Sequence, residues 1–370
     1  MSSRRLFAVV LAAGKGTRMQ SSRPKPLHLL CGKPMVLYVL DALAQCDVEV
    51  VSVVVGTGAE RVVKKLHAEA GGLPLEFVEQ AHQRGTGDAA AVGLSVLPTD
   101  DEDEAGDVIV LPGDTPLLEP GTIANLLEHH RETGAACTVL TARLDDPTGY
   151  GRIVRGRDDR VVRIVEQSDG SPTELAIDEV NTSIYCFKRG FLAPALRRIS
   201  PENAQGELYL TDAVAVLADT GNQVEAISVA DAAETAGVND RIQLAAAEAA
   251  LRRRTNLAWM RAGVTMLDPS ATYLDTTVEL APDVTLFPNV LLQGRTVVGE
   301  GTEIGPDVRL VDCAVGAGAR VSSTTARDAE IGPGATVGPY AVLEPGAQIP
   351  GDAVTGPFYT ALSSEGDAAD

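Results

Sequence analysis

A glycine-rich segment near the N-terminus has the composition of a phosphate-binding turn. The sequence LAAGKGTRM, residues 11–19, continues directly from the apolar run Leu6–Leu11. Glycines let backbone N–H groups face an anion closely, and a phosphate ligand usually lies at the carboxyl end of a parallel strand. Arg18 and Lys25 add positive charge nearby. The segment matches neither GxxxxGK nor GxGxxG, because Met19 stands where a third glycine should be. On these residues alone, a purely structural turn is an equal alternative.

The elements that would position this turn follow an α/β pattern. Up to about residue 238, short β-rich runs alternate with helical stretches, and several runs are continuously apolar, as in a buried sheet. We therefore expect an α/β domain with a Rossmann-like, mostly parallel sheet over residues 1–238. The expected strands are Leu6–Leu11, Glu49–Val55, Asp107–Leu111, Ala136–Ala142 and Ser183–Phe187, and the expected helices include Met35–Gln45, Ala59–Glu69 and Thr122–Thr133.

A helix and a six-residue repeat follow. Residues 239–265 form an expected connecting helix, since Asn239–Ala262 is rich in Ala, Leu and Arg and lacks proline and glycine. Beyond it, aliphatic residues recur every six positions, often with a glycine next to them, which is typical of hexapeptide repeats. The residues in phase are Val298, Ile304 and Leu310, then Val315 and Val321, then Ile331, Val337, Leu343 and Ile349. We predict a short left-handed parallel β-helix over 266–357 with about four to five coils, followed by a disordered tail over 358–370.

Composition limits the classes of partner. The formal net charge of −20 argues against nucleic acid, whose phosphates need a basic surface. No apolar run approaches the roughly 18 residues of a membrane helix. The five cysteines are scattered without a CxxC pair, which favours a reducing cytoplasm over a disulfide framework or a structural zinc site. The acidic run 100–104 is expected to be a solvated loop and not a metal site.

Longer motifs point to one family. The string LAAGKGTRM followed by PK resembles the signature of sugar-nucleotide pyrophosphorylases. The remaining motifs resemble, in order, those of the bacterial bifunctional N-acetylglucosamine-1-phosphate uridylyltransferase/glucosamine-1-phosphate acetyltransferase family. They are QAHQRGTG (80–87), PGDTPL (112–117), YGRI (150–153), VE (165–166), VNT (180–182), NAQGELYLTD (203–212), GVN (237–239) and MRAGV (260–264). The resemblance runs from about residue 6 to residue 350.

The resemblance implies a set of binding roles. Nucleotide-binding positions would be Leu11, Ala12, Ala13, Gly14, Lys25, Gln80, Gly85 and Thr86. Sugar-binding positions would be Gly151, Glu166, Asn181 and Asn239. Arg18, Lys25 and Asp114 would be catalytic, and Asp114 and Asn239 would ligate Mg²⁺. Taken without the family, Asp114 could instead be a turn or helix-capping residue, and surface roles would suit Glu166 and Asn181.

These residue types suit a nucleotidyl transfer. A sugar 1-phosphate is already ionised and needs no general base to attack the α-phosphorus of a nucleoside triphosphate in line. Catalysis then consists of positioning and charge neutralisation. One carboxylate and one amide suit Mg²⁺, which keeps the rest of its shell for phosphate and water. The expected substrates are UTP and N-acetylglucosamine 1-phosphate, giving UDP-N-acetylglucosamine and pyrophosphate.

The β-helix departs from the family pattern. The acetyltransferase half of the family uses a histidine base with lysine and arginine residues around the phosphate. Here all histidines precede residue 131, the last lysine is Lys188, and the family's arginine in the LxPG corner is replaced by Glu344. Without a base of suitable pKa, we expect acetyltransferase activity to be absent. The β-helix is expected to serve assembly of the chain into a homo-oligomer, namely a homotrimer.

Two other functions remain open on the sequence. Another sugar 1-phosphate or another nucleoside triphosphate would keep the same mechanism. A non-catalytic regulatory subunit is the alternative from a different class, and it is disfavoured by the intact set Arg18, Lys25, Asp114 and Asn239.

Overall fold

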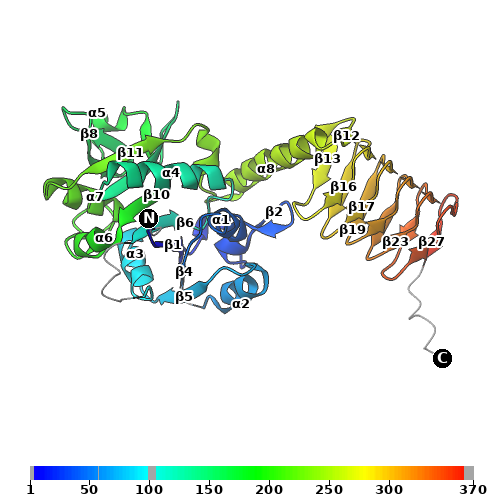
Figure 1. Cartoon of the computed structure of the whole chain (residues 1–370), viewed down its shortest axis with the longest axis horizontal. Helices are drawn as coiled ribbons and strands as arrows, with labels where there is room; N and C mark the ends of the chain where they lie inside the picture. Colours follow the sequence, from blue (N-terminus) through cyan, green and yellow to red (C-terminus); the bar gives the residue numbers. More distant parts are fainter. Residues whose placement is uncertain (1–3, 57, 99–105, 362–370) are drawn as a thin grey trace. The chain divides into compact units, whose positions relative to one another are not determined.

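The computed structural model describes residues 4–56, 58–98 and 106–361 of the chain (Figure 1). It divides into two compact units. The first holds residues up to 28 and 34–244, and the second holds residues 29–33 and everything from 245 onward. The predicted acidic loop at 100–104 lies outside the described residues. The predicted boundary at residue 238 falls six residues before the division after Leu244. The sequence analysis did not predict that the short segment 29–33 belongs to the second unit.

The first unit is built on a nine-stranded sheet that is mostly parallel, as predicted. Its central order is β11-β7-β10-β6-β1-β4-β5, with the hairpin β8–β9 attached to β10. Strands β4, β1 and β6 run parallel, whereas β10 runs antiparallel to both β6 and β7. The strands are β1 (Leu6–Ala12), β4 (Val50–Gly56), β5 (Leu75–Gln80), β6 (Asp107–Pro112), β7 (Cys137–Arg143), β8 (Arg152–Arg155), β9 (Val161–Val165), β10 (Glu179–Lys188) and β11 (Val224–Ser228).

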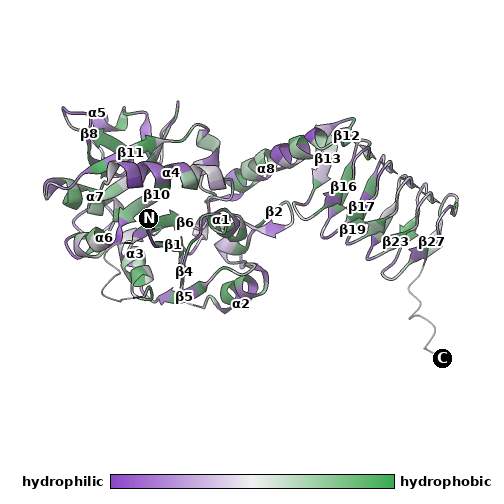
Figure 2. Cartoon of the chain, in the orientation of Figure 1, coloured by the Kyte–Doolittle hydropathy of each residue, from purple (hydrophilic) through white to green (hydrophobic). Residues whose placement is uncertain are grey.

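Helices cover both faces of this sheet because the continuously apolar strands present buried side chains on each side. One buried cluster joins residues of α1, α2 and α4 to one face of the strands, and a second joins α3, α6 and α7 to the other. Figure 2 shows the apolar residues concentrated in the central strands. The helices are α1 (Met35–Leu43), α2 (Glu60–Glu69), α3 (Thr86–Leu94), α4 (Pro120–Thr133), α5 (Pro172–Leu175), α6 (Arg189–Leu196) and α7 (Leu210–Asp219).

The predicted connecting helix is present as α8 (Arg241–Arg261). Within the second unit its later turns are fixed by Asn256, which is 1% exposed and donates from Nδ2 to the carbonyl oxygens of Pro269 and Thr272 at 2.8 and 3.0 Å. The small strands β2 (Leu29–Leu30) and β3 (Lys33–Pro34) meet in the segment that contains Cys31. The Cys31 amide donates to a carboxylate oxygen of Glu248 in α8 at 2.9 Å, which holds this segment to the helix.

The rest of the second unit is a parallel β-helix, the left-handed hexapeptide class predicted from the repeat. Its coils place successive short strands on three sheets. The first sheet is β12 (Thr265–Met266), β15 (Thr285–Leu286), β18 (Glu303–Ile304), β21 (Arg320–Val321) and β24 (Thr336–Val337). The second is β13 (Thr272–Leu274), β16 (Val290–Gln293), β19 (Val308–Val311), β22 (Thr325–Arg327), β25 (Val342–Leu343) and β27 (Thr360–Ala361). The third is β14 (Glu279–Leu280), β17 (Val297–Val298), β20 (Ala314–Val315), β23 (Glu330–Ile331) and β26 (Gln348–Ile349).

The six-residue period places one aliphatic side chain per strand inside the coils. Every predicted in-phase residue is buried in a single core that runs along the β-helix. One column joins Val298, Val315, Ile331 and Ile349, each paired with the next in parallel register. The prediction of the repeat is thus confirmed residue by residue.

The predicted tail begins too early. Thr360–Ala361 forms β27 and pairs in parallel with Val342–Leu343, so residues 358–361 belong to the β-helix. The physical reason is that the open end of a coil offers unpaired backbone groups, which these residues satisfy although they carry no aliphatic repeat. The remainder of the predicted tail, 362–370, lies outside the described residues.

Candidate functional site

The site lies at the carboxyl edge of the parallel strands of the first unit. Register fixes which residues meet there: Leu11 pairs with Pro112, Ala12 with Val55, and Gly56 with Gln80. The segments that follow these strand ends therefore start side by side. This is the edge at which open α/β sheets bind ligands.

The glycine-rich turn leaves room for an anion. A side chain at Gly14 would meet no heavy atom within 4 Å, so the backbone there is open to a ligand. Gly16 has φ +60°, in the left-handed region that favours glycine, and a Cβ there would lie 2.7 Å from Cβ of Lys25. The turn thus brings the main chain and the Lys25 side chain close together, before the short 3₁₀ helix Thr17–Met19 that carries Arg18.

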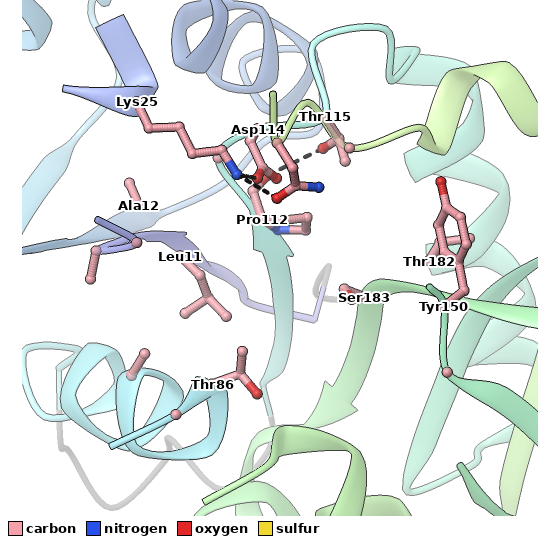
Figure 3. A pocket seen from close by; sticks show the side chains of 18 of the residues that line it. Leu11, Ala12, Lys25, Thr86, Pro112, Asp114, Thr115, Tyr150, Thr182 and Ser183 are labelled. Atoms are coloured by element: carbon pink, nitrogen blue, oxygen red, sulfur yellow. Dashed lines mark hydrogen bonds and ion pairs between the residues drawn. The ribbon is translucent and has the colours of Figure 1, made fainter. Parts of the chain in front are cut away.

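Four polar residues from three distant segments converge above this turn. The Lys25 ammonium forms an ion pair with Asp114 and donates to Oδ1 of Asn239 at 2.8 Å. Nη2 of Arg18 donates to the same amide oxygen at 3.0 Å. The backbone supports the meeting, because the Val238 N–H donates to the Asp114 carbonyl at 2.9 Å. Figure 3 shows Lys25 and Asp114 together on one side of the cavity, with Thr86 across from them.

Asp114 and Asn239 can hold a divalent cation. One ammonium contacts an oxygen of each, so both oxygens face a single cation position. A carboxylate and an amide are hard oxygen donors that leave most of an octahedral shell to phosphate and water, which suits Mg²⁺. In the described part of the chain, no group of three or more His, Cys, Asp and Glu gathers into a metal cluster. The two oxygen donors of Asp114 and Asn239 fit a metal that takes its other ligands from substrate and water.

The opposite wall is formed by the segment between β5 and α3. Gln80, 4% exposed, donates from Nε2 to the Gly85 carbonyl at 3.2 Å and to Oδ2 of Asp88 at 2.8 Å. Gly85 has φ +115°, and a Cβ there would lie 2.5 Å from the Leu208 carbonyl oxygen. Oγ1 of Thr86 accepts from the Leu210 N–H at 3.0 Å. This wall is consequently locked to the start of α7.

A third group lines the side of the cavity near β8–β10. Oε1 of Glu166 accepts from the Thr211 hydroxyl at 3.0 Å, and Nδ2 of Asn181 donates to the Tyr185 hydroxyl at 2.8 Å. The Asn181 N–H donates to the Gly151 carbonyl at 2.9 Å. Burial raises the pKa of Glu166; the Thr211 hydrogen bond opposes this shift, and the nearby charges of Asp212 and Asp169 add to it.

One cavity of about 550 Å³ joins the three groups. Every residue assigned a role in the sequence lines it, namely Leu11, Ala12, Ala13, Gly14, Arg18, Lys25, Gln80, Gly85, Thr86, Asp114, Gly151, Glu166, Asn181 and Asn239. The structure therefore brings the whole predicted set together.

The cavity also contains residues for which the sequence analysis gave no role. Gln83, whose amide donates to the Ala13 carbonyl, and Glu207 line it, together with Tyr150, Thr182 and Ser183. Gln83, Tyr150, Thr182 and Glu207 stand inside the motifs quoted above, so their motif context was the available signal. Burial, and then the charge of Asp114, raise the pKa of Tyr150.

At this sheet edge the chain combines an open glycine-rich turn, a cation position and a polar cavity, and a hexapeptide β-helix follows in sequence. These features define a nucleotidyltransferase joined to a β-helix. Comparison with known proteins agrees. Residues 8–208 match the family model of the MobA-like NTP transferase domain.

The similarity extends over nearly the whole chain. The bifunctional protein GlmU of Shouchella clausii is 43% identical over 343 residues, which cover 93% of this chain and 74% of the relative. The GlmU of a Mycobacterium species (strain KMS) is 46% identical, covering 96% and 71%, and that of Mycobacterium tuberculosis H37Ra is 44% identical, covering 96% and 72%. The chain belongs to the GlmU family.

Proposed function

We propose that the chain forms UDP-N-acetylglucosamine and pyrophosphate from UTP and N-acetylglucosamine 1-phosphate. The observation that carries this proposal is the convergence of Arg18, Lys25, Asp114 and Asn239 at one end of a cavity in a GlmU-family chain. Glu166 and Asn181 line the same cavity and offer polar groups to the hydroxyl and N-acetyl groups of a sugar.

The proposed reaction needs charge control more than proton transfer. A phosphate monoester carries between one and two negative charges near neutral pH, so its oxygen can attack the α-phosphorus without a general base. A bond forms between that oxygen and the α-phosphorus, and the bond to the bridging oxygen of pyrophosphate breaks. The chain has to hold the two anions in line and offset their charges.

Each residue then has a physical task. The open backbone at Gly14 and the cations Arg18 and Lys25 would hold the phosphate groups, with Leu11, Ala12 and Ala13 along the same turn. Gln80, Gly85 and Thr86 would hold the base and ribose. Asp114 and Asn239 would hold Mg²⁺, which supplies further charge neutralisation at the phosphates when it is bound. Gly151, Glu166 and Asn181 would hold the amino-sugar.

The test is pyrophosphate release by the purified chain with Mg²⁺, with the four common nucleoside triphosphates scanned against a panel of sugar 1-phosphates. Turnover confined to UTP and N-acetylglucosamine 1-phosphate is the expected result. A different preferred pair would replace the substrates but keep the mechanism. Folded protein without turnover on any pair would contradict the proposal.

We further propose that the β-helix does not transfer acetyl groups and serves assembly, as a homotrimer in the cytoplasm. The support is the lack of any histidine after His130 and of any lysine after Lys188 in the sequence, with Glu344 in the corner after Leu343. All five cysteines are free in the described structure, and none of its helices is long and apolar enough to cross a membrane. Acetyl-CoA turnover with glucosamine 1-phosphate tests the lack of acetyl transfer, and sedimentation measurements test the homotrimer.

A further inference from the structure

We propose that Asp88 is a positioning residue that sets the base preference of the nucleotide site by fixing the orientation of the Gln80 amide. This inference rests on the proposed function, since it concerns the same nucleotide wall. Asp88 itself does not line the cavity, whereas Gln80 does.

The first step is the geometry of the amide. Gln80 is the last residue of β5, and its side chain is buried against the first turn of α3, where Asp88 lies. Its Nε2 donates to Oδ2 of Asp88 at 2.8 Å and to the Gly85 carbonyl at 3.2 Å. Both acceptors are anchored. The positive end of the helix dipole favours a carboxylate at Asp88, and the peptide of Gly85 is held against Leu208.

The second step is that this geometry allows one amide orientation. A glutamine amide has two N–H donors and one carbonyl acceptor. A carboxylate and a backbone carbonyl can only accept. A flipped amide would place Oε1 against two oxygens with no proton between them and would leave a buried group unpaired. The NH₂ group of Gln80 therefore donates to Asp88 and Gly85, and Oε1 remains as the atom that can accept a hydrogen bond from a ligand.

The third step concerns the base. Uracil presents an N3–H donor between two carbonyl acceptors, whereas cytosine presents a bare N3 acceptor at the same place. A fixed carbonyl oxygen on the cavity wall pairs with the uracil N3–H and is repelled by the cytosine N3. If Asp88 were absent, the Gly85 carbonyl at 3.2 Å would still accept from the amide, but the flipped orientation would cost less and could offer N–H to either base. Asp88 thus fixes the Gln80 amide, which could otherwise donate or accept, so that it presents an acceptor to the base, although Asp88 does not line the cavity.

The test compares (kcat/KM) for UTP with that for CTP in the wild-type chain and in Asp88→Ala. We expect the UTP-to-CTP ratio to fall about ten-fold in Asp88→Ala, in the size range of one hydrogen-bonded contact. The change should appear mainly as a higher KM for UTP, because the base contact is made equally in the ground and transition states. Asp88→Asn keeps a side-chain oxygen that accepts from Gln80 and should retain most of the wild-type ratio.

Two controls complete the design. Glu79→Ala removes the carboxylate of the exposed neighbour of Gln80 in β5 and should leave the ratio unchanged. If Asp88→Ala does not fold, Asp88→Ser replaces it, because the shorter side chain does not reach the amide but keeps a polar group beside the free N–H groups of the first helical turn. A UTP-to-CTP ratio in the folded variant equal to that of wild type overturns the positioning role. If the wild-type chain itself lacks turnover, the proposed function fails. Calorimetric binding of UDP and CDP to both proteins then decides the positioning role on its own: a smaller UDP preference in Asp88→Ala supports it, and an equal preference overturns it.

Discussion

The Lys25 ammonium donates to the side-chain oxygen of Asn239 at 2.8 Å, although the two residues lie 214 positions apart in the chain. The same ammonium pairs with Asp114, so one lysine bridges the two residues proposed to bind Mg²⁺. A cation already occupies the position that the metal would take. Metal binding therefore requires Lys25 to move toward the phosphates it is proposed to hold.

Replacing Asp114 with alanine should abolish turnover without unfolding the chain. The variant removes the carboxylate from the cation position, and the loss of one preorganised electrostatic contact in an active site typically costs about 100- to 1000-fold in kcat. Pyrophosphate release at saturating UTP, sugar phosphate and Mg²⁺ measures it. Thermal melting should remain near that of wild type, because the Asp114 side chain is partly exposed.

Glu128→Gln is the matched control for this experiment. Glu128 is an exposed carboxylate on α4, away from the cavity. It changes the net charge by the same amount and should leave kcat unchanged. Wild-type rates in Asp114→Ala would remove Asp114 from the metal site.

Lys25→Met should separate metal affinity from turnover. Without the ammonium, Asp114 loses the cation paired with it, and the Asn239 oxygen keeps its contact with Arg18 but loses the one with Lys25, so the free protein should bind Mg²⁺ more tightly. Turnover should nevertheless fall about 100-fold, because a charge proposed to offset the phosphates is lost. Calorimetric Mg²⁺ titration without nucleotide, paired with a rate assay, checks both parts. Weaker Mg²⁺ binding in the variant would contradict the competition.

Glu166→Gln should affect stability and activity in opposite directions. Burial raises the pKa of Glu166 from its ordinary value of 4.5. An acid with a raised pKa in the folded state stabilises the fold at low pH, and this contribution is lost as pH rises through the folded-state pKa. The glutamine variant does not titrate, so it should melt at a higher temperature than wild type near pH 7. The gap should close on acidification below pH 4.5.

The same substitution should raise the KM for the sugar phosphate about ten-fold, since a neutral amide replaces a charged acceptor. Thr211→Val is the companion variant. It removes the hydroxyl that donates to Glu166 and should raise the Glu166 pKa further. Equal melting temperatures for wild type and Glu166→Gln across this pH range would show that burial of the ionised Glu166 carboxylate does not destabilise the fold.

Local pattern was sufficient to predict most of the architecture. The continuous apolar runs at Leu6–Leu11 and Asp107–Leu111 predicted buried strands, and these became β1 and β6 with ends one residue later. The period of six predicted the β-helix because one buried aliphatic residue per strand is the condition for stacking the coils. The local pattern did not predict that β10 runs antiparallel to β6 and β7, because the alternation of strands and helices along the chain does not give the direction in which a strand pairs.

The sequence predicted which residues form the site, but it did not predict how these residues contact one another. Every residue to which the motifs assigned a role lines the cavity, whereas Thr148 and Ser183 line it from outside the quoted motifs. The motifs could not show that Lys25 bridges Asp114 and Asn239, or that Asp88 holds Gln80, because these contacts join segments whose approach depends on the whole sheet. β27 was missed for a similar reason: its pairing with β25 depends on the coil below it and not on its own residues.

Asp107→Asn should destabilise the first unit more at neutral pH than in acid. The Asp107 side chain is fully buried and accepts from Nε of Arg131 at 3.0 Å, with Nε of Arg4 at 3.3 Å. Burial alone would raise its pKa, but the nearby His130 ring, with Nε2 at 3.6 Å from Oδ1, the hydrogen bond from Arg131 and the charge of Arg4 hold the pKa below its ordinary value of 3.8. A depressed pKa gives stability that is present above the unfolded-state pKa and is lost as pH falls.

We expect the asparagine variant to lose about 3 kcal/mol of unfolding free energy near pH 7, as when one partner leaves a buried charge network. The difference from wild type should shrink as pH falls below 3.8. Urea denaturation at several pH values measures it. A loss that does not depend on pH would assign the effect to packing and not to the charge.

Ile331→Ala should weaken the β-helix while leaving the nucleotidyltransferase reaction intact. Ile331 is 2% exposed and lies in the column between Val315 and Ile349. Truncating a buried isoleucine to alanine typically costs about 2–5 kcal/mol, because a cavity remains where the side chain packed. The first and second units have separate cores, so calorimetry should show one transition at a lower temperature and the other unmoved.

Pyrophosphate release at a temperature below both transitions should match wild type. Glu330→Ala, at the exposed neighbouring position in β23, is the control and should move neither transition. An equal shift of both transitions would mean that the two cores unfold together, and it would contradict the independence on which this prediction rests.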